Sequence, residues 1–284
     1  MTWVWIAAAA LLVAAGVMGN NRLVVTRYRV ELPGLAPAVG RGTKAARIRI
    51  VHLSDLHGKR FGRGERDRLV RTVRACLPDL IAISGDLLSR RRDVTLDAIE
   101  QVRALAALAP VVVCRGNHDL HPRQWDELVA ALGGEAVHLL QNDLAVLQVA
   151  GTSLLVAGVE ERAVYGEDEQ AWLEALRALS HKASAHPHPR ILLAHRPDHI
   201  SRYAGTCFAL SLSGHAHGGQ VRIPGVGALW APDQGFLPRH AEGIHRGDGF
   251  TAVVSRGLGP STFPLRIANP PQVILLECEP PVVS

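Results

Sequence analysis

The chain has 284 residues, of which 48% are hydrophobic, so it is long enough for one large domain or two small ones with a core of ordinary size. The formal net charge is +5, but the basic residues are scattered and no aromatic ladder or nucleic-acid motif accompanies them, which argues against a nucleic-acid partner. The four cysteines lie in or beside apolar segments without close pairing, which argues against a disulfide framework and against thiolate chemistry.

An uncharged apolar segment, Thr2–Met18, stands at the beginning of the sequence. Its length is at the short end of the roughly 17–25 residues that a transmembrane helix needs. Trp3 and Trp5 suit a membrane interface, and basic residues follow the segment rather than precede it, which favours an uncleaved anchor with the rest of the chain facing the cytoplasm. Cleavage and export remain alternatives. We therefore predict a single-pass cell-membrane protein with a membrane anchor over residues 1–20, a juxtamembrane linker over 21–45 and a soluble domain over 46–284.

Apolar runs alternate with amphipathic segments through the first half of this domain. The predicted strands are "RIRIVHLSD", "LIAISGD" and "VVVCRGNHD", and the predicted helices are Glu65–Leu77, Thr95–Leu108 and Pro122–Leu132. In the second of these helices, Leu96, Ile99, Val102 and Leu105 have helical spacing, so we expect them to share one buried face.

The pattern changes in the second half of the domain. "LAVLQVAGTSLLVAGVE" predicts a hairpin that turns at Gly151-Thr152, and Asp168–His181 predicts a helix. Further strands are predicted in "RILLAH" and "CFALSLSGH", near Val221, and over Thr251–Ser255 and Gln272–Cys278. This alternation predicts an α/β fold of two mixed β-sheets, packed as a sandwich, flanked by helices and preceded by one N-terminal transmembrane helix.

Metal-competent side chains follow five separate apolar runs. In chain order they are Asp55 and His57, then Asp86, then Asn117, His118 and Asp119, then His195, and finally His215 and His217. Because ligands in α/β sheets bind outside the carboxyl ends of the strands, we expect these side chains to converge on one rim. Carboxylates and imidazoles gathered in a partly dry cleft require a cation.

The donor types indicate which cation. Oxygen and imidazole donors without thiolates suit Mn²⁺, Fe²⁺ or Zn²⁺ better than Ca²⁺ or a structural zinc site. The donors outnumber what one ion needs, so we predict two divalent ions, with Mn²⁺ first among the candidates and Asp86 as the bridge. Each motif alone has an ordinary structural alternative, such as a solvated turn, a hydrogen-bonded core histidine or a helix cap at Asn117. The ordered set makes those alternatives much weaker.

The order of the motifs resembles that of the calcineurin-like metallophosphoesterases, D-x-H, G-D, G-N-H-D, H and G-H-x-H, over roughly Ile48 to Gln272. The matching pieces are Asp55-Leu56-His57, Gly85-Asp86, Gly116-Asn117-His118-Asp119, His195 and Gly214-His215-Ala216-His217. The resemblance implies one metal held by Asp55, His57, Asp86 and His217, and another held by Asp86, Asn117, His195 and His215. It also implies that His118 faces the phosphoryl group and the leaving oxygen, with Asp119 holding its orientation.

A narrower resemblance lies in "GHAHGGQVRIP" and "SRGLGPSTFPLRIANPPQVILLE". These stretches are similar to a membrane-associated branch of the family that includes phosphodiesterases and UDP-2,3-diacylglucosamine pyrophosphatases. The resemblance implies a membrane-anchored phosphodiesterase or pyrophosphatase that uses a metal-bridging hydroxide, with a lipid-linked or nucleotide-lipid phosphoester as a candidate substrate. The alternative is a non-catalytic metal-binding scaffold or regulator of the same fold. Arg266 is either a solvated charge or a contact for a substrate phosphate, and no protein partner is implied.

Overall fold

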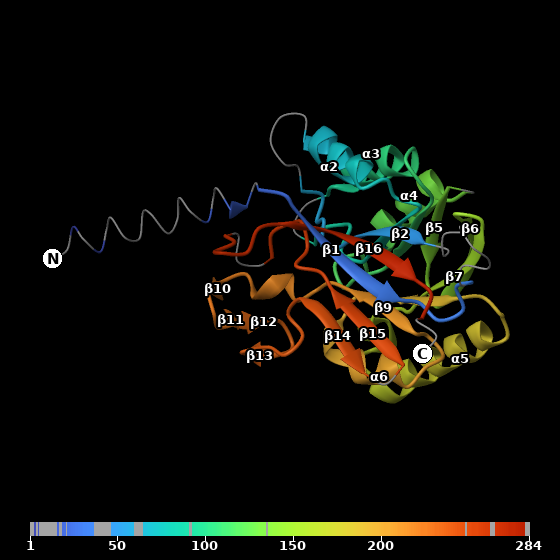
Figure 1. Cartoon of the computed structure of the whole chain (residues 1–284). Coiled ribbons are helices and arrows are strands. Elements are labelled where there is room, and N and C mark those ends of the chain that lie inside the picture. The colour runs from blue at the N-terminus through green and yellow to red at the C-terminus, as the bar shows by residue number, and fades with distance from the viewer. Residues whose placement is uncertain are drawn as a thin grey trace, which may run out of the picture.

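The structure of the chain is a computed structural model. Two six-stranded mixed sheets form its centre (Figure 1). The first sheet has, in spatial order, β1 (Val24–Glu31), β16 (Gln272–Glu279), β2 (Ile48–Leu53), β3 (Leu80–Ser84), β4 (Val111–Cys114) and β5 (Val137–Leu140). Strands β2 to β5 run parallel to one another, whereas β16 runs antiparallel to β2. The carboxyl ends of β2, β3 and β4 therefore lie at one edge of this sheet.

The second sheet has, in spatial order, β14 (Gly243–Gly247), β15 (Phe250–Val254), β9 (Leu210–Ser213), β8 (Arg190–Leu193), β7 (Thr152–Gly158) and β6 (Asp143–Val149). Strands β15, β9, β8 and β7 are parallel neighbours. The predicted hairpin is confirmed as the antiparallel pair β6–β7. Its turn is centred on Ala150 and Gly151, which both have positive φ, one residue earlier than predicted.

Helices cover the outer face of each sheet, so the predicted sandwich flanked by helices is confirmed. α2 (Glu65–Ala75), α3 (Thr95–Ala106) and α4 (Pro122–Leu132) cover the first sheet, and α5 (Glu169–Ser184) and α6 (Ile200–Ala204) cover the second. The period-two pattern of the strands explains this arrangement: in β3, Ile81 and Ile83 pack toward the helices, whereas Leu80 and Ala82 pack toward the other sheet.

The structure describes residues 22–36, 47–59, 65–90, 93–134, 136–247, 249–261 and 265–281, together with Trp3, Trp5, Gly16, Gly19 and Asn20. The predicted anchor, Thr2–Met18, lies almost entirely outside these residues. Within the described part of the chain, no helix combines the length and the apolar character that crossing a bilayer requires.

Two expectations need correction. The predicted linker, 21–45, contains β1, which pairs in parallel with β16, and the following Leu32 is fully buried between the sheets. Basic and apolar residues alternate in β1, as they do in an edge strand with one solvated face. A basic juxtamembrane stretch has a similar composition, so the sequence does not distinguish the two. In α3, Leu96 is 77% exposed, because the buried face is formed by Ala98, Ile99, Val102 and Leu105 with Thr95 and Gln101.

The single strand predicted near Val221 is part of a more elaborate insert. Two short hairpins lie between the last predicted metal ligand and β14: β10 (Arg222–Ile223) with β11 (Gly227–Ala228), and β12 (Trp230–Ala231) with β13 (Gly235–Phe236). These four strands lie together at one side of the molecule, away from β5, β6 and α5 (Figure 1). Val221 itself forms an isolated bridge with Ile267.

Candidate metal centre

Every residue of the predicted site follows the carboxyl end of a strand. Asp55 and His57 follow β2, Asp86 follows β3, Asn117, His118 and Asp119 follow β4, His195 follows β8, and His215 and His217 follow β9. Hydrogen bonds join the two sheets at this edge: His195 Nδ1 donates to the Ser84 carbonyl at 2.8 Å, and the His215 backbone N–H donates to Asp55 Oδ1 at 3.0 Å. The structure therefore brings strand ends from both sheets to one rim.

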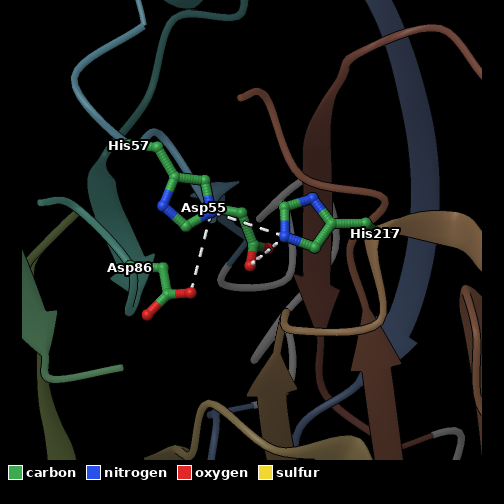
Figure 2. A group of neighbouring side chains, drawn as sticks. All are labelled: Asp55, His57, Asp86 and His217. Carbon is green, nitrogen blue, oxygen red and sulfur yellow. Dashed lines mark hydrogen bonds and ion pairs between the residues drawn. The ribbon is translucent and has the colours of Figure 1, made fainter. Parts of the chain in front are cut away.

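Four buried side chains form the first half of the centre. Asp55, His57, Asp86 and His217 present ligand atoms that all lie within 4.8 Å of one another (Figure 2). His217 Nε2 lies 3.4 Å from Asp55 Oδ1, and His57 Nε2 lies 3.7 Å from Asp86 Oδ2. His57 Nδ1 lies 3.1 Å from the Leu88 carbonyl, which only accepts, so the proton sits on Nδ1 and the lone pair of Nε2 faces the cluster.

The second half of the centre lies on the other side of Asp86. His195 Nε2 is 3.3 Å from Asp86 Oδ2, and it is buried without a hydrogen-bond partner among the described residues. Since His195 Nδ1 donates to a carbonyl, this Nε2 carries a lone pair that no described residue satisfies. The neighbouring His215 Nδ1 lies 2.9 Å from Asn117 Oδ1. An unsatisfied imidazole lone pair beside an amide oxygen and a carboxylate fits a divalent cation.

Asp233 supports this second half from outside, and the sequence analysis missed it. Its Oδ2 lies 2.7 Å from His215 Nε2 and 2.7 Å from an Arg196 guanidinium nitrogen. A carboxylate accepts, so Nε2 of His215 carries the proton; in that tautomer Nδ1 and Asn117 Oδ1 are two acceptors 2.9 Å apart, a contact that a cation held between them would satisfy. This is the carboxylate–histidine arrangement that orients metal ligands in proteins. Asp233 lies in the turn between β12 and β13, in a segment without the hydrophobic period that marks the other site residues.

We expect Asp233→Ala to weaken binding at the second half of the centre about 10–100-fold, the usual effect of losing such a supporting carboxylate. Isothermal titration with Mn²⁺ checks this, with the first half of the centre as an internal reference. Asp198→Ala is the matched control, because Asp198 also contacts Arg196 but does not contact His215. Equal weakening in both variants would assign the effect to Arg196 rather than to the tautomer of His215.

His118 lies beside the cluster without joining it. Its ring is 4.6 Å from the His57 ring, centroid to centroid, and its backbone N–H donates to Asp86 Oδ1 at 2.7 Å. Burial lowers the pKa of His118 to about 4, and the charge of Asp86 opposes this only in part, so the ring is neutral at neutral pH. A neutral imidazole at the rim carries one N–H that it can donate to a bound group.

The hydrogen bonds of the Asp119 carboxylate come from backbone N–H groups rather than from the ring of His118. Its buried carboxylate accepts hydrogen bonds from the backbone N–H groups of Leu88 at 2.7 Å, Gly116 at 2.9 Å and Leu87 at 3.3 Å. These bonds tie the loop after β3 to the loop after β4, so Asp119 fixes the backbone on which Asp86 and His118 stand. Burial, followed by the charge of Asp86, raises the pKa of Asp119 to about 6 despite these bonds.

Five of the proposed ligands have backbone conformations that L-residues seldom adopt. The φ angles are 51° at Asp55, 49° at His57, 54° at Asp86, 65° at His215 and 49° at His217. Each such residue costs on the order of 1–3 kcal/mol and persists only where the surrounding structure holds it. Close packing helps to fix the backbone at these residues. A Cβ on Gly214 would lie 1.7 Å from Ser54 Oγ, so only glycine fits before His215.

Arg266 is not a solvated charge, because it is only 1% exposed. Its guanidinium donates to the carbonyls of Arg256 at 2.8 Å and Gly259 at 3.2 Å, and Nη2 lies 3.4 Å from Nδ1 of His217. It therefore packs behind His217, on the side of the ring opposite to the nitrogen that faces Asp55. Burial lowers the pKa of Arg266 to about 10, which leaves it charged at neutral pH.

Glu161 is a second residue that the sequence analysis missed. It is 4% exposed, and its Oε2 has no hydrogen-bond partner among the described residues. Burial raises the pKa of Glu161 to about 7, although His195 and His215 oppose this shift. The pattern that predicts the metal-competent residues, an apolar run followed by a polar side chain, also occurs here, since "LLVAGVEE" is an apolar run that ends in two carboxylates.

Comparison with known proteins gave consistent matches. A family model described as "Calcineurin-like phosphoesterase" matches residues 48–219. The chain is 28% identical to "Uncharacterized metallophosphoesterase YkuE" of Bacillus subtilis, over 94% of this chain and 91% of that protein. It is 29% identical to "Phosphodiesterase YaeI" of Escherichia coli, over 82% and 83%. A Danio rerio "Transmembrane protein with metallophosphoesterase domain" is 28% identical, over 78% of this chain and 51% of that protein.

Proposed function

The chain belongs to the calcineurin-like phosphoesterase family, and from that membership we propose that it hydrolyses phosphoesters at a centre for two divalent metal ions. One ion would be held by Asp55, His57, Asp86 and His217, and the other by Asp86, Asn117, His195 and His215. The observation that carries the proposal is the unsatisfied Nε2 of His195 opposite the buried carboxylate of Asp86. Mn²⁺ is the first candidate metal, with Fe²⁺ and Zn²⁺ as alternatives.

When bound, such a pair of ions supplies hydroxide at neutral pH and neutralises charge on the phosphoryl oxygens. The remaining work falls to the chain. His118, neutral and at the rim, donates its N–H to the departing oxygen and so stabilises the charge that develops there. Asp119 keeps the loops of Asp86 and His118 in register through its three backbone hydrogen bonds. No covalent enzyme intermediate is required.

We extend the proposal to the substrate and the location. The substrate is a phosphodiester or a pyrophosphate, with a lipid-linked or nucleotide-lipid compound as the leading candidate, and the name of the Escherichia coli relative supports phosphodiester cleavage. Attachment to the cell membrane through Thr2–Met18, with the catalytic domain on the cytoplasmic side, is supported by the apolar sequence, by the basic residues that follow it and by the name of the Danio rerio relative.

Metal removal tests the proposed hydrolase. Dialysis against a chelator is expected to abolish turnover of bis(p-nitrophenyl) phosphate, and Mn²⁺ is expected to restore it with two ions bound per chain, because the proposed mechanism takes its hydroxide from the metal ions. Elemental analysis and the rate of p-nitrophenolate release check both statements. Full turnover by chelated, metal-free protein would contradict the proposal, and metal binding without turnover would favour the non-catalytic scaffold.

A further inference from the structure

The hairpin insert presents a group of large apolar side chains to solvent. Ile223 is 44% exposed, Val226 61%, Trp230 51%, Phe236 81% and Leu237 62%. We call these five side chains the hairpin surface. The other exposed large apolar side chains of the described residues are distributed over several elements, such as Leu77 after α2, Leu96 on α3 and Val146 on β6. Several large exposed apolar side chains on one small insert indicate an interaction site, whereas single exposed residues are ordinary.

The strand register explains why these side chains point outward. Trp230 pairs directly with Phe236 across β12 and β13, so the two rings stand on the same face of the hairpin. Their neighbour Ala231 and the β11 residue Ala228 are buried against the body of the protein. The insert thus turns its small residues inward and its large apolar residues outward. An insert that only covered a core would bury its large apolar residues instead.

We propose that the hairpin surface docks on a phospholipid bilayer. Exposed Trp and Phe side chains suit the boundary between headgroups and acyl chains, where their rings are buried and the Trp N–H stays hydrated. The exposed Arg239 follows the surface directly, and the chain as a whole carries a formal charge of +5, which complements anionic lipids. Large aromatic side chains combined with positive charge fit a lipid surface better than an acidic or polar partner protein.

The backbone connects the hairpin surface to the end of the apolar N-terminal segment. The Arg222 N–H donates to the Ile267 carbonyl, and the Ile267 N–H donates to the Gln220 carbonyl, both at 3.0 Å. The preceding residue, Arg266, donates its N–H to Asn20 Oδ1 at 2.9 Å. Asn20 is two residues beyond Met18, so the chain enters the folded domain beside β10. A bilayer that holds Thr2–Met18 therefore lies next to the hairpin surface.

The same insert reaches the metal centre. Asp233, in the turn that joins Trp230 to Phe236, contacts His215. The insert also packs closely against the loop of His217, because a Cβ on Gly219 would lie only 2.4 Å from the Cβ of Ala228. Docking of the hairpin surface would hold the rim of the centre at the level of the lipid headgroups. This consequence and the argument from Thr2–Met18 rest on the proposed function, whereas the exposed side chains and their strand register do not.

Depth measurement on the full chain tests the proposal. Phe236→Cys and, on the other hairpin, Val226→Cys are labelled with an environment-sensitive fluorophore in a Cys207→Ser background, because Cys207 is the described cysteine that is only half-buried. The protein is reconstituted in phosphatidylcholine–phosphatidylglycerol vesicles. Leu96→Cys is the matched control, since Leu96 is similarly apolar and exposed but lies on α3. Emission and quenching by nitroxide lipids are recorded for each label.

We expect both hairpin labels to shift to the blue and to be quenched by nitroxides placed about 5–10 Å below the headgroup boundary, with no change at position 96. Hairpin labels that behave like the control, or protein that does not float with the vesicles, would overturn the proposal. So would a blue shift that depends on protein concentration without vesicles, which would indicate a second copy of the chain. Because the readout needs no turnover, failure here is distinct from failure of the hydrolase proposal.

Discussion

Asp86→Ala is expected to remove both metal ions together and to lower turnover by about 10³-fold or more. Asp86 contacts both halves of the centre, since its Oδ2 lies 3.7 Å from His57 Nε2 and 3.3 Å from His195 Nε2. Loss of the metals removes several kcal/mol of transition-state stabilisation.

Elemental analysis and the rate on bis(p-nitrophenyl) phosphate measure the two effects on the same sample. Asp86→Asn is the matched variant, because it keeps the shape and one oxygen but not the charge, and it is expected to retain more metal than the alanine variant. Asp86→Ala also removes the Oδ1 that accepts a hydrogen bond from the His118 backbone N–H. Thermal unfolding of both variants shows whether this loss destabilises the fold. Retention of one ion at undiminished affinity in Asp86→Ala would show that this carboxylate does not bridge.

His118→Asn is expected to leave both metal ions bound and to lower kcat on an alkyl ester about 10²–10⁴-fold, the usual contribution of a positioned proton donor. The reason is geometric: the ring lies beside His57, whereas the metal-facing donors come from other residues. The backbone N–H that binds Asp86 is unchanged by the substitution. Metal content and kcat separate this variant from every ligand variant.

The leaving group provides the control for the proposed role of His118. If the ring stabilises the departing oxygen, the loss in His118→Asn should be small for a p-nitrophenyl ester, whose leaving group is already stable as an anion, and large for an alkyl ester. An equal loss with both esters would mean that His118 positions the substrate instead. Loss of metal from this variant would contradict its placement outside the ligand set.

The sequence predicts which side chains converge at one edge of the sheets, because the signal is simple. An apolar run that ends in Asp86 or in His195 needs no knowledge of the full topology: parallel strands bring their carboxyl ends to one edge, and the motif order matches a known family. His195 differs from His181, His186, His188 and His199 by its place directly after an apolar run, and its ring lies against Asp86. The alternation of strands and helices is sufficient to predict the two covered sheets.

Other features carry no local signal. Asp233 acts on His215 from a Pro- and Gly-containing turn 18 residues along the chain, and nothing in its surroundings is periodic. Arg266 is buried because three carbonyl contacts and His217 surround it, which hydropathy alone cannot reveal. Strand β1 escapes prediction because an edge strand with Arg27 and Arg29 on its outer face has the composition of a basic linker. In each case, tertiary context decides what the local sequence leaves open.

The left-handed backbone lowers the stability of the fold at the residues proposed to bind metal, namely Asp55, His57, Asp86, His215 and His217. Glycine would occupy each of these conformations at lower energy, so replacing these residues would relieve the backbone strain at the centre. A laboratory search for heat resistance alone would therefore be drawn toward replacing them and would end with a sturdier, inert protein. Only a requirement for turnover during selection keeps such a corner of the molecule intact.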